Sequence, residues 1–431
     1  MTAKSGGYTP PHTGNLRPRE TAPVDNRESP LMRIQLWSCN YEPEPMGIAP
    51  LSAIWAKAMT DRGHVVDVVA AHPHYPEPQW GSKLRPYREI RNGIPVTRLP
   101  LIIGRKYKSQ RLIQELSFMA SQMASLPFLG SPDVLISVTP SFPALLPGIV
   151  NSRLRRVPWI LWIQDILPDG AATTGYVEQE GVAYRSSRQL ESAAYRSSSH
   201  IIVLSESFCN NLTEKGVPAG KISLAYNPAT MSYDPDAPMR GEVPGPPRVL
   251  CMGNIGKSQG LAQIVKVFES DERLANAGAE LALAGAGVAE DEVRAAITTD
   301  RVKMLGVLGG ADLKAEIDRS HLGAVTQAYS GGEFNVPSKL MNYLAVGLPV
   351  VASVRPESEA ARIVNESGGG WVSDSADPTG FVESIVEAMA SPEELTRRSQ
   401  SGVEFAKNNL SVEVLAAKFE VAMADVTGSG K

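Results

Sequence analysis

The chain has 431 residues, of which 42 are basic and 46 acidic, giving a formal net charge of −4 at pH 7. The near balance of charges gives no signal for nucleic-acid binding, and a hydrophobic fraction of 43% excludes a disordered or fibrous chain. Because domains commonly contain about 100–200 residues, the length favours two domains.

Cysteine usage and apolar segments indicate the compartment. Cys39, Cys209 and Cys251 lie far apart and form no CxxC pair, which argues against a disulfide framework and favours a reducing cytosol. The N-terminus lacks the apolar core of a signal peptide, and no run of about 18 uncharged apolar residues is present. We therefore expect a cytoplasmic protein.

Residues 1–30 are rich in Pro, Gly, Arg and Asn and are expected to form a disordered tail. From residue 31 to 232, short apolar runs alternate with helical patterns such as 48–63, which predicts parallel βαβ units and a first doubly wound domain. The strands are expected at 32–37, 64–70, 133–138, 157–163, 200–205 and 221–226.

A Pro-rich stretch follows, and residues 233–247 are interpreted as a linker. The alternation resumes in a second domain over 248–408, and a C-terminal helix and tail are expected over 409–431. Strands are predicted at 248–253, 280–285, 302–306, 323–328 and 349–353, and helices at 258–269, 311–319, 337–346, 392–408 and 411–425. The fold class is therefore α/β, with two doubly wound domains. Since such sheets bind ligands at the carboxyl ends of their strands, two facing domains would form a cleft.

Three loops each follow a predicted strand and open a helix: EPEPMGIAP (42–50), GNIGKSQG (253–260) and AYSGGEFNVPSK (328–339). Glycines allow the backbone to approach a ligand, and a helix N-terminus offers N–H groups and a positive dipole end to a phosphate. Alternatively, the glycines only shape tight turns. The second loop is not a Walker loop, because it lacks the required GK[ST] spacing.

Other polar residues have two interpretations each. His72 and His74 are spaced as a metal pair without a local third ligand, so hydrogen bonding within their loop is the alternative. Asp165 ends an apolar strand and is either a turn former or part of the site. Glu333 and Lys339 flank the third loop and are either ligand contacts or surface charges. No metal site is expected.

The third loop and its helix, GGEFNVPSKLMNYLAVGLPVVAS, resemble the donor-binding segment of retaining glycosyltransferases of family 4, which have the GT-B architecture. GNIGKSQGL is similar to the phosphate loop of that family. NYEPEPMGIAP and the sequence after it are similar to the acceptor-domain opening of the branch that builds bacterial exopolysaccharide, O-antigen and colanic-acid chains. The resemblance covers residues 31–425. It implies two Rossmann-like domains facing each other across a cleft, with the acceptor domain first and the nucleotide-sugar domain second.

The resemblance also implies the site. The residues that would bind the nucleotide sugar are Gly47, Gly253, Asn254, Gly256, Lys257, Phe334, Asn335, Ser338 and Asn342. The residues implied at the reacting centre are Glu333, Asp165 and Lys339. The chain departs from the family pattern, because the two glutamates usual eight positions apart are replaced by Phe334 and Asn342, with Glu333 one residue earlier. The usual histidine near Asp165 is Gln164.

The implied reaction is retaining transfer of a sugar from a nucleotide sugar, expected to be UDP-linked, to a glycan or lipid-linked acceptor. A helix N-terminus aided by Lys257 or Lys339 would stabilise the leaving diphosphate, so no metal or other cofactor is expected. A UDP-sugar 2-epimerase shares the architecture and would recruit His72 or His74 as acid or base. A non-enzymatic sugar-binding protein is the third interpretation.

Residues 104–130 are the candidate segment for contact with a membrane. Its basic residues Arg105, Lys106, Lys108 and Arg111 come before a helical stripe of Leu112, Leu116, Met119 and Met123. A cationic start followed by an apolar face is typical of a helix at an anionic membrane surface, here the inner face of the plasma membrane. Alternatively, the stripe packs on the core of its own domain. Arg153, Arg155 and Arg156 would extend a basic patch.

Overall fold

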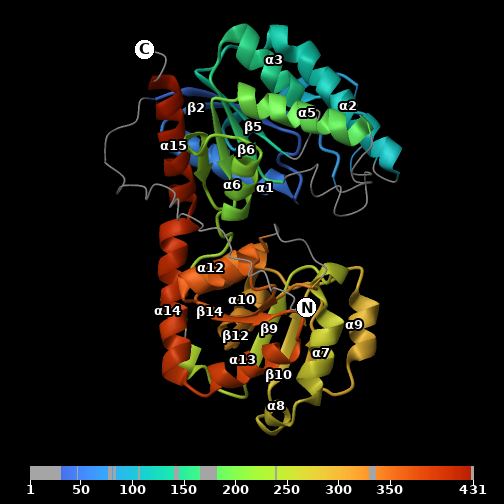
Figure 1. Cartoon of the computed structure of the whole chain (residues 1–431), viewed down its shortest axis with the longest axis vertical. Coiled ribbons are helices and arrows are strands. Elements are labelled where there is room, and N and C mark those ends of the chain that lie inside the picture. Colours follow the sequence, from blue (N-terminus) through green and yellow to red (C-terminus); the bar gives the residue numbers. More distant parts are fainter. Residues whose placement is uncertain are drawn as a thin grey trace, which may run out of the picture.

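The computed structural model describes residues 31–45, 47–75, 80, 84–104, 107–139, 145–165, 182–237, 240–329 and 336–428. Two α/β domains are stacked along the long axis of the molecule (Figure 1), as the sequence predicts. The tail expected over residues 1–30 lies outside the described part of the chain.

The N-terminal domain is built on an eight-stranded sheet with the order β3-β4-β2-β1-β5-β6-β7-β8. Its strands are β1 (Arg33–Ser38), β2 (Val65–Ala71), β3 (Tyr87–Arg91), β4 (Ile94–Leu99), β5 (Val134–Val138), β6 (Trp159–Ile163), β7 (His200–Val203) and β8 (Ile222–Leu224). Its helices are α1 (Ile48–Asp61), α2 (Lys108–Ser125), α3 (Leu145–Arg155), α5 (Val182–Ser197) and α6 (Glu206–Glu214). The pairings are parallel except for the β3–β4 hairpin at the sheet edge, which the sequence analysis did not predict.

The C-terminal domain has a parallel six-stranded sheet with the order β11-β10-β9-β12-β13-β14. Its strands are β9 (Arg248–Met252), β10 (Glu280–Ala284), β11 (Val302–Met304), β12 (Leu322–Thr326), β13 (Val350–Val354) and β14 (Gly370–Asp374). Its helices are α7 (Leu261–Ser270), α8 (Glu272–Asn276), α9 (Glu290–Ala296), α10 (Gly310–Asp318), α11 (Ser338–Ala345), α12 (Glu359–Ser367), α13 (Thr379–Met389) and α14 (Pro392–Asn409). The strand order reverses between β9 and β12, so the ligand-binding edge is expected at their carboxyl ends.

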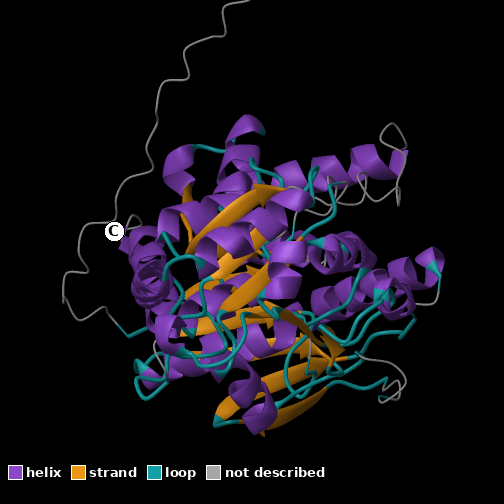
Figure 2. Ribbon diagram, turned by 90° about the horizontal axis from the view of Figure 1, so that it is seen from below, coloured by secondary structure: helices purple, strands orange, loops and turns teal. Residues whose placement is uncertain are grey.

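Both sheets are covered by helices on their two faces, and the strands lie inside (Figure 2). In the C-terminal domain, α7, α9 and α13 cover one face, and α11 and α12 cover the other. The strands are buried on both faces, which explains why their sequences are nearly continuous apolar runs.

The last helix, α15 (Val412–Gly428), returns to the N-terminal domain. Leu415, Phe419 and Met423 are fully buried in the core that α1 and the N-terminal sheet form. The Phe419 ring lies 4.9 Å from the ring centroids of both Trp55 and Trp162. The chain therefore crosses twice between the domains, and the two crossings meet where Ala229 N–H donates to the Leu410 carbonyl at 2.9 Å.

The Pro-rich segment after the first crossing packs on the C-terminal domain. Arg240 is buried and donates hydrogen bonds to the carbonyls of Ile317 at 2.8 Å and Gly347 at 3.0 Å. Burial lowers the pKa of this guanidinium, although it stays charged at neutral pH. The segment is thus held on one domain by a buried cation bonded to backbone carbonyls.

A buried carboxylate joins the two domains beside the crossings. Glu359, the first residue of α12, accepts hydrogen bonds from the Ser207 hydroxyl at 2.8 Å and from the Glu206 N–H at 3.2 Å, at the N-terminus of α6. Arg362 pairs with Glu359 and donates to the Tyr226 hydroxyl at 2.6 Å. Burial opposes ionisation of Glu359, but the hydrogen bonds from Arg362 and Ser207 outweigh it and lower the pKa of this carboxyl. A carboxylate of one domain therefore caps a helix of the other.

Candidate active site

The loops that leave β9 and β10 are tied together at the carboxyl edge of the C-terminal sheet. Gly253 N–H donates to the Ala284 carbonyl, and Ile255 N–H to the Ala286 carbonyl, both at 2.9 Å. Gly253 has a φ of 100°, a left-handed conformation that favours glycine. Hydrogen bonds to the backbone at the end of β10 therefore hold the loop 253–260 in place.

This bracing depends on two glycines that the sequence analysis missed. A Cβ on Gly285 would lie 1.7 Å from the Gly253 carbonyl oxygen, and a Cβ on Gly287 would lie 2.4 Å from the Ile255 carbonyl oxygen. No side chain fits at these distances. The signal was present, since GAG (285–287) follows a predicted strand just as the glycines of 253–256 do.

The same loop is also joined to the segment after β12. Ala328 N–H donates to the Ser258 carbonyl at 2.8 Å, and Gly260, with a φ of 63°, precedes α7. The starts of α7 and of the segment that leads to α11 therefore lie on either side of the switch point.

Tyr343 holds α11 against β9. Its ring occupies a notch left by Gly323 on β12, where a Cβ would approach the ring to 2.7 Å. Its hydroxyl donates to the Leu250 carbonyl at 2.9 Å and accepts from the Met252 N–H at 2.8 Å. Complete burial raises the pKa of Tyr343 well above its usual value, so the hydroxyl stays protonated. The N-terminus of α11 is thereby fixed beside the end of β9.

Lys339 is the second residue of α11, and only 9% of it is exposed. Its Nζ lies 3.5 Å from both the Gln259 Oε1 and the Cys251 Sγ. A Cβ on Gly253 would lie 4.0 Å from the Lys339 Cε, so the side chain passes beneath the glycine loop. A buried ammonium at a helix start, under a loop with exposed backbone, is suited to holding a phosphate.

Among the described residues of the C-terminal domain, four candidates share the glycine loop above this ammonium, and Ser338 precedes Lys339 on α11. Gly253, Asn254 and Lys257 are exposed on the loop, and the Asn254 side chain lies over Gly256, whose Cβ would be 2.7 Å from the Asn254 Nδ2. Ser338 is exposed at the first position of α11. Their roles in nucleotide binding stay predictions.

Asn342 is engaged elsewhere, since its Oδ1 accepts from the Thr230 N–H at 2.8 Å and from the Thr230 hydroxyl at 3.2 Å. This residue therefore links α11 to the first chain crossing, a contact that its place in the sequence did not indicate. The predicted residues Glu333, Phe334 and Asn335 lie outside the described residues.

Two candidates lie at the carboxyl edge of the N-terminal sheet. Gly47, with a φ of 66°, is exposed just before α1, and nothing lies within 4 Å of the place a Cβ would take. Asp165 is exposed after β6, where its carbonyl lies 3.5 Å from the Thr139 hydroxyl. Its neighbour Gln164 exchanges two amide hydrogen bonds, at 3.0 Å and 2.7 Å, with Asn227 in the first crossing.

His72 and His74 belong to a buried hydrogen-bond network centred on Glu44. Glu44 is 2% exposed and accepts from the His74 N–H at 2.6 Å, the Tyr75 N–H at 2.9 Å and the Asn40 Nδ2 at 2.7 Å. The His74 Nδ1 lies 2.9 Å from the His72 carbonyl. These bonds favour the hydrogen-bonding interpretation and fix the loop that leads to Gly47. In the part of the chain that the structure describes, no three His, Cys, Asp or Glu side chains are grouped to hold a metal.

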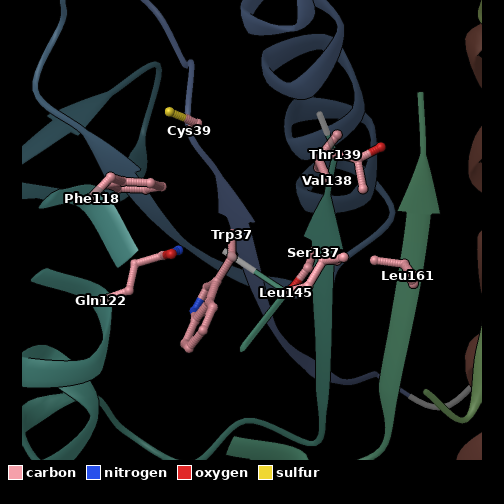
Figure 3. Close-up of a pocket in the computed structure, with 9 residues that line it drawn as sticks. All are labelled: Trp37, Cys39, Phe118, Gln122, Ser137, Val138, Thr139, Leu145 and Leu161. Carbon is pink, nitrogen blue, oxygen red and sulfur yellow. The ribbon is translucent and has the colours of Figure 1, made fainter. Parts of the chain in front are cut away.

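The N-terminal domain encloses a small cavity between β1, β5 and α2 (Figure 3). Trp37, Phe118 and Gln122 line it, and its volume of about 10 Å³ is room for one water at most. The Gln122 Oε1 is buried there without a hydrogen-bond partner. A substrate does not fit this cavity. A larger pocket of about 310 Å³ lies in the C-terminal domain, between the start of α7 and the ends of β12, β13 and β14.

Helix α2 exposes an apolar face. Leu112 and Leu116 are 56% and 42% exposed, whereas Gln114 and Gln122 on the opposite face are buried. The alternative that this stripe packs on its own core is therefore wrong for Leu112 and Leu116. Arg155 is half-buried and donates to the backbone carbonyls of Leu126 and Leu129, whereas Arg153 and Arg156 are exposed. Among the described helices, none is long and apolar enough to span a bilayer.

Two family models match the chain, one for each domain. Residues 47–228 match the family described as glycosyl transferase 4-like domain, and residues 246–391 match glycosyl transferases group 1. The putative colanic acid biosynthesis glycosyl transferase WcaI of Escherichia coli K12 is 27% identical over 416 residues, which are 90% of this chain and 98% of that protein. The probable glycosyltransferase WbjE of Pseudomonas aeruginosa is 26% identical over 69% of this chain and 76% of its own.

Solved structures share the fold at low identity. Sucrose-phosphate synthase from Thermosynechococcus elongatus has a TM-score of 0.67 at 16% identity, covering 92% of this chain and 99% of that one. Anabaena Alr3699/HepE in complex with UDP has a TM-score of 0.63 at 16% identity, covering 91% of this chain and 100% of that one. Both agree with the two-domain architecture predicted from the sequence.

Proposed function

Since this chain is a glycosyltransferase of the GT-B fold, with a glycosyl transferase 4-like domain followed by a group 1 domain, we propose that it transfers a sugar from a UDP-sugar, with retained configuration, to a glycan or lipid-linked acceptor. The relative named for colanic acid biosynthesis supports a role in making a cell-surface polysaccharide. The UDP complex of the Anabaena neighbour supports uridine as the nucleoside. The second domain binds the donor and the first binds the acceptor.

The observation that carries this proposal is the buried ammonium of Lys339 at the start of α11, beneath the glycine loop 253–260. In glycosyl transfer the anomeric carbon becomes oxocarbenium-like while charge grows on the departing diphosphate. Preformed donors aimed at that charge are the main source of rate enhancement, and they need no rearrangement during the reaction. Lys339 and the N–H groups at the helix start supply such donors, so the transfer proceeds without a metal ion.

The remaining chemistry is assigned to the residues that the sequence predicts at the reacting centre. The leaving phosphate accepts the proton of the attacking acceptor hydroxyl on the same face of the sugar, which retains the configuration. Glu333 orients the donor sugar, Asp165 lies beside the reacting centre, and Gly47 adds backbone donors from the first domain.

An epimerase is not favoured. His72 and His74, which would have to act as acid or base, are both almost fully buried, and His74 is held by Glu44 and by the backbone. The comparisons also name transferases rather than epimerases.

The test uses the full-length chain with a panel of UDP-sugars, with and without a lipid-linked or oligosaccharide acceptor and with EDTA. We expect acceptor-dependent release of UDP that survives chelation, and an α-linked product from an α-linked donor by NMR. A changed sugar on intact UDP would identify an epimerase instead. Loss of turnover in EDTA would refute metal independence.

We also propose that α2 contacts an anionic membrane while the acceptor is lipid-linked. Support comes from the exposed side chains of Leu112, Ile113 and Leu116, which lie just after the basic start of the helix. Each basic residue near an anionic surface contributes on the order of 1 kcal/mol, and salt screens this attraction.

Sedimentation with phosphatidylglycerol vesicles tests this membrane contact. The double variant Leu112→Gln, Leu116→Gln should sediment much less than the wild type, and wild-type binding should fall steeply from low to physiological salt. Val288→Gln, which replaces an 83% exposed residue of the other domain, is the matched control. Failure of the wild type to sediment at low salt, or equal binding of all variants, would contradict the proposal.

A further inference from the structure

Residues 227–230, in the first chain crossing, form a bridge that is bonded to both domains. At one end, Asn227 exchanges two amide hydrogen bonds with Gln164 of the N-terminal domain, at 3.0 Å and 2.7 Å. At the other end, Thr230 donates to the Asn342 Oδ1 of α11, from its N–H at 2.8 Å and from its hydroxyl at 3.2 Å. A chain of four residues spans at most about 14 Å, so the bridge leaves little slack between its two ends.

The backbone of the bridge is restrained along its length. Pro228 is buried, and its ring fixes one of its backbone torsions. Ala229 N–H donates to the Leu410 carbonyl of the second crossing at 2.9 Å. On the side of the N-terminal domain, the Gln164 N–H donates to the Thr139 hydroxyl at 2.9 Å. The bridge therefore has few free torsions with which to absorb a displacement of either end.

Each end of the bridge lies next to a residue assigned to the reaction. Gln164 precedes Asp165 at the carboxyl end of β6. Asn342 follows Lys339 by three positions on α11, so the two residues are neighbours on the surface of this helix. The bridge thus joins the half of the site in the first domain to the anion site in the second.

The amide groups suit these two ends. An amide donates through its nitrogen and accepts through its oxygen, so Gln164 and Asn227 can exchange two bonds, which a histidine at position 164 cannot do with one amide. The chain departs from the family pattern at both ends of the bridge, since residue 164 is Gln instead of the usual His and residue 342 is Asn instead of the usual Glu. Two separate departures therefore belong to one structural element.

We propose that Gln164 and Asn342 are positioning residues, which act through the bridge to hold Asp165 and Lys339 at the separation that sugar transfer needs. Transfer requires the reacting atoms to meet at about 3–3.5 Å, and a misplacement of about 1 Å can lower the rate about a hundredfold. Neither amide has to touch the nucleotide in this role, and the Asn342 Oδ1 is already bonded to Thr230. The role in catalysis rests on the proposed glycosyl transfer, whereas the link between the domains does not.

The experiment measures kcat and the donor KM for acceptor-dependent UDP release, and the Kd of UDP by calorimetry, in the full-length chain. The variants are Gln164→Met and Asn342→Leu, which remove each amide at nearly constant volume, and their combination. If the melting curve shows that Asn342→Leu does not fold, Thr230→Val, which removes only the hydroxyl bond, takes its place. Asn276→Leu is the control, because Asn276 is exposed at the end of α8, at the far end of the second domain (Figure 1).

Each single variant should lower kcat by at least about threefold, the usual effect of one neutral hydrogen bond, while the donor KM and the Kd of UDP stay within about twofold. Because both amides act through one bridge, the combined variant should lose little more than the worse single variant, whereas independent residues would multiply their effects. Interchange of the amides, Gln164→Asn with Asn227→Gln, should restore the activity that Gln164→Asn alone loses. The control should keep the wild-type kcat.

Hydrogen exchange tests the link between the domains without any turnover. In Gln164→Met, the Ala229 and Thr230 amides should exchange at least about threefold faster than in the wild type, although their bonding partners are on other parts of the chain. Asn276→Leu should leave both exchange rates unchanged.

Any of four results would overturn the proposal: unchanged kcat in both single variants; multiplied losses in the combined variant; weaker UDP binding by Asn342→Leu alone, which would make Asn342 a nucleotide contact; or unchanged exchange at Ala229 and Thr230 in Gln164→Met. If the wild type releases no UDP from any donor, the proposed function fails, and the exchange rates still decide whether the bridge links the domains.

Discussion

Replacing Lys339 by methionine tests whether its buried ammonium binds the phosphates of UDP or only adds to the charge of the surface. Methionine fills nearly the same volume beneath Gly253 but removes the ammonium that lies 3.5 Å from the Gln259 Oε1. A hydrogen bond to a charged group contributes about 1.5–3 kcal/mol. Because Lys339 is only 9% exposed, solvent screens this contribution little. With tenfold in affinity for every 1.4 kcal/mol, UDP should bind about ten- to a hundredfold more weakly.

Calorimetric titration of the full chain with UDP in EDTA measures this effect. Lys266→Met is the matched control, since Lys266 is an exposed lysine on α7 of the same domain and a screened surface charge contributes at most about 1 kcal/mol. The melting temperatures should show that both variants stay folded. The reasoning would be refuted if Lys339→Met bound UDP within twofold of the wild type, or if Lys266→Met weakened UDP binding as much as Lys339→Met.

Three further predictions concern the site and its support. Glu333→Gln should lower kcat/KM by at least about tenfold, or roughly 1.4 kcal/mol of transition-state stabilisation, with little change in melting temperature; unchanged kinetics would make Glu333 a surface charge. Gly285→Ala should destabilise the chain to urea by about 1–3 kcal/mol, because a Cβ meets the Gly253 carbonyl at 1.7 Å, whereas Gly309→Ala, with open space around it, should not. Because the pKa of Glu359 is lowered in the folded state, its stabilising effect is present above the ordinary glutamate pKa of about 4.3 and is lost as pH falls through the folded value. Chemical denaturation from pH 7 to pH 3 should show a steeper loss of stability for the wild type than for Glu359→Gln, and parallel curves would contradict the role of this carboxylate.

The strands and helices of the doubly wound cores could be predicted because their patterns are local. Strands buried on both faces read as apolar runs, and their helices repeat with helical spacing. The β3–β4 hairpin was missed although its signal is local too. Asn92 and Gly93 have φ values of 50° and 81°, and an Asn-Gly pair between short strands is the usual mark of such a turn. β14 was missed because its sequence, GWVSD, begins with a glycine and ends in polar residues instead of reading as an apolar run. Glycine is required at its start, since a Cβ on Gly370 would lie 2.2 Å from the Val350 carbonyl oxygen.

The site was less predictable because its support comes from distant parts of the chain. Nothing near Asn342 indicates that its amide oxygen accepts from Thr230, and nothing near Tyr343 indicates that its hydroxyl bridges the β9 backbone. The resemblance placed candidates along the sequence, but the notch at Gly323 that seats Tyr343 exists only once β12 and α11 have packed.

The return of α15 to the first domain affects the order in which the protein can be made. During synthesis, the N-terminal sheet leaves the ribosome long before Phe419, so Trp55 and Trp162 lack their aromatic neighbour while the whole second domain is being translated. The second domain contains all of its own strands and can complete its core first. The core of the first domain is complete only when α15 packs on it. A nascent chain therefore exposes the apolar surface around Trp55 and Trp162 until translation is nearly finished. Chaperones would have to protect this surface for that time.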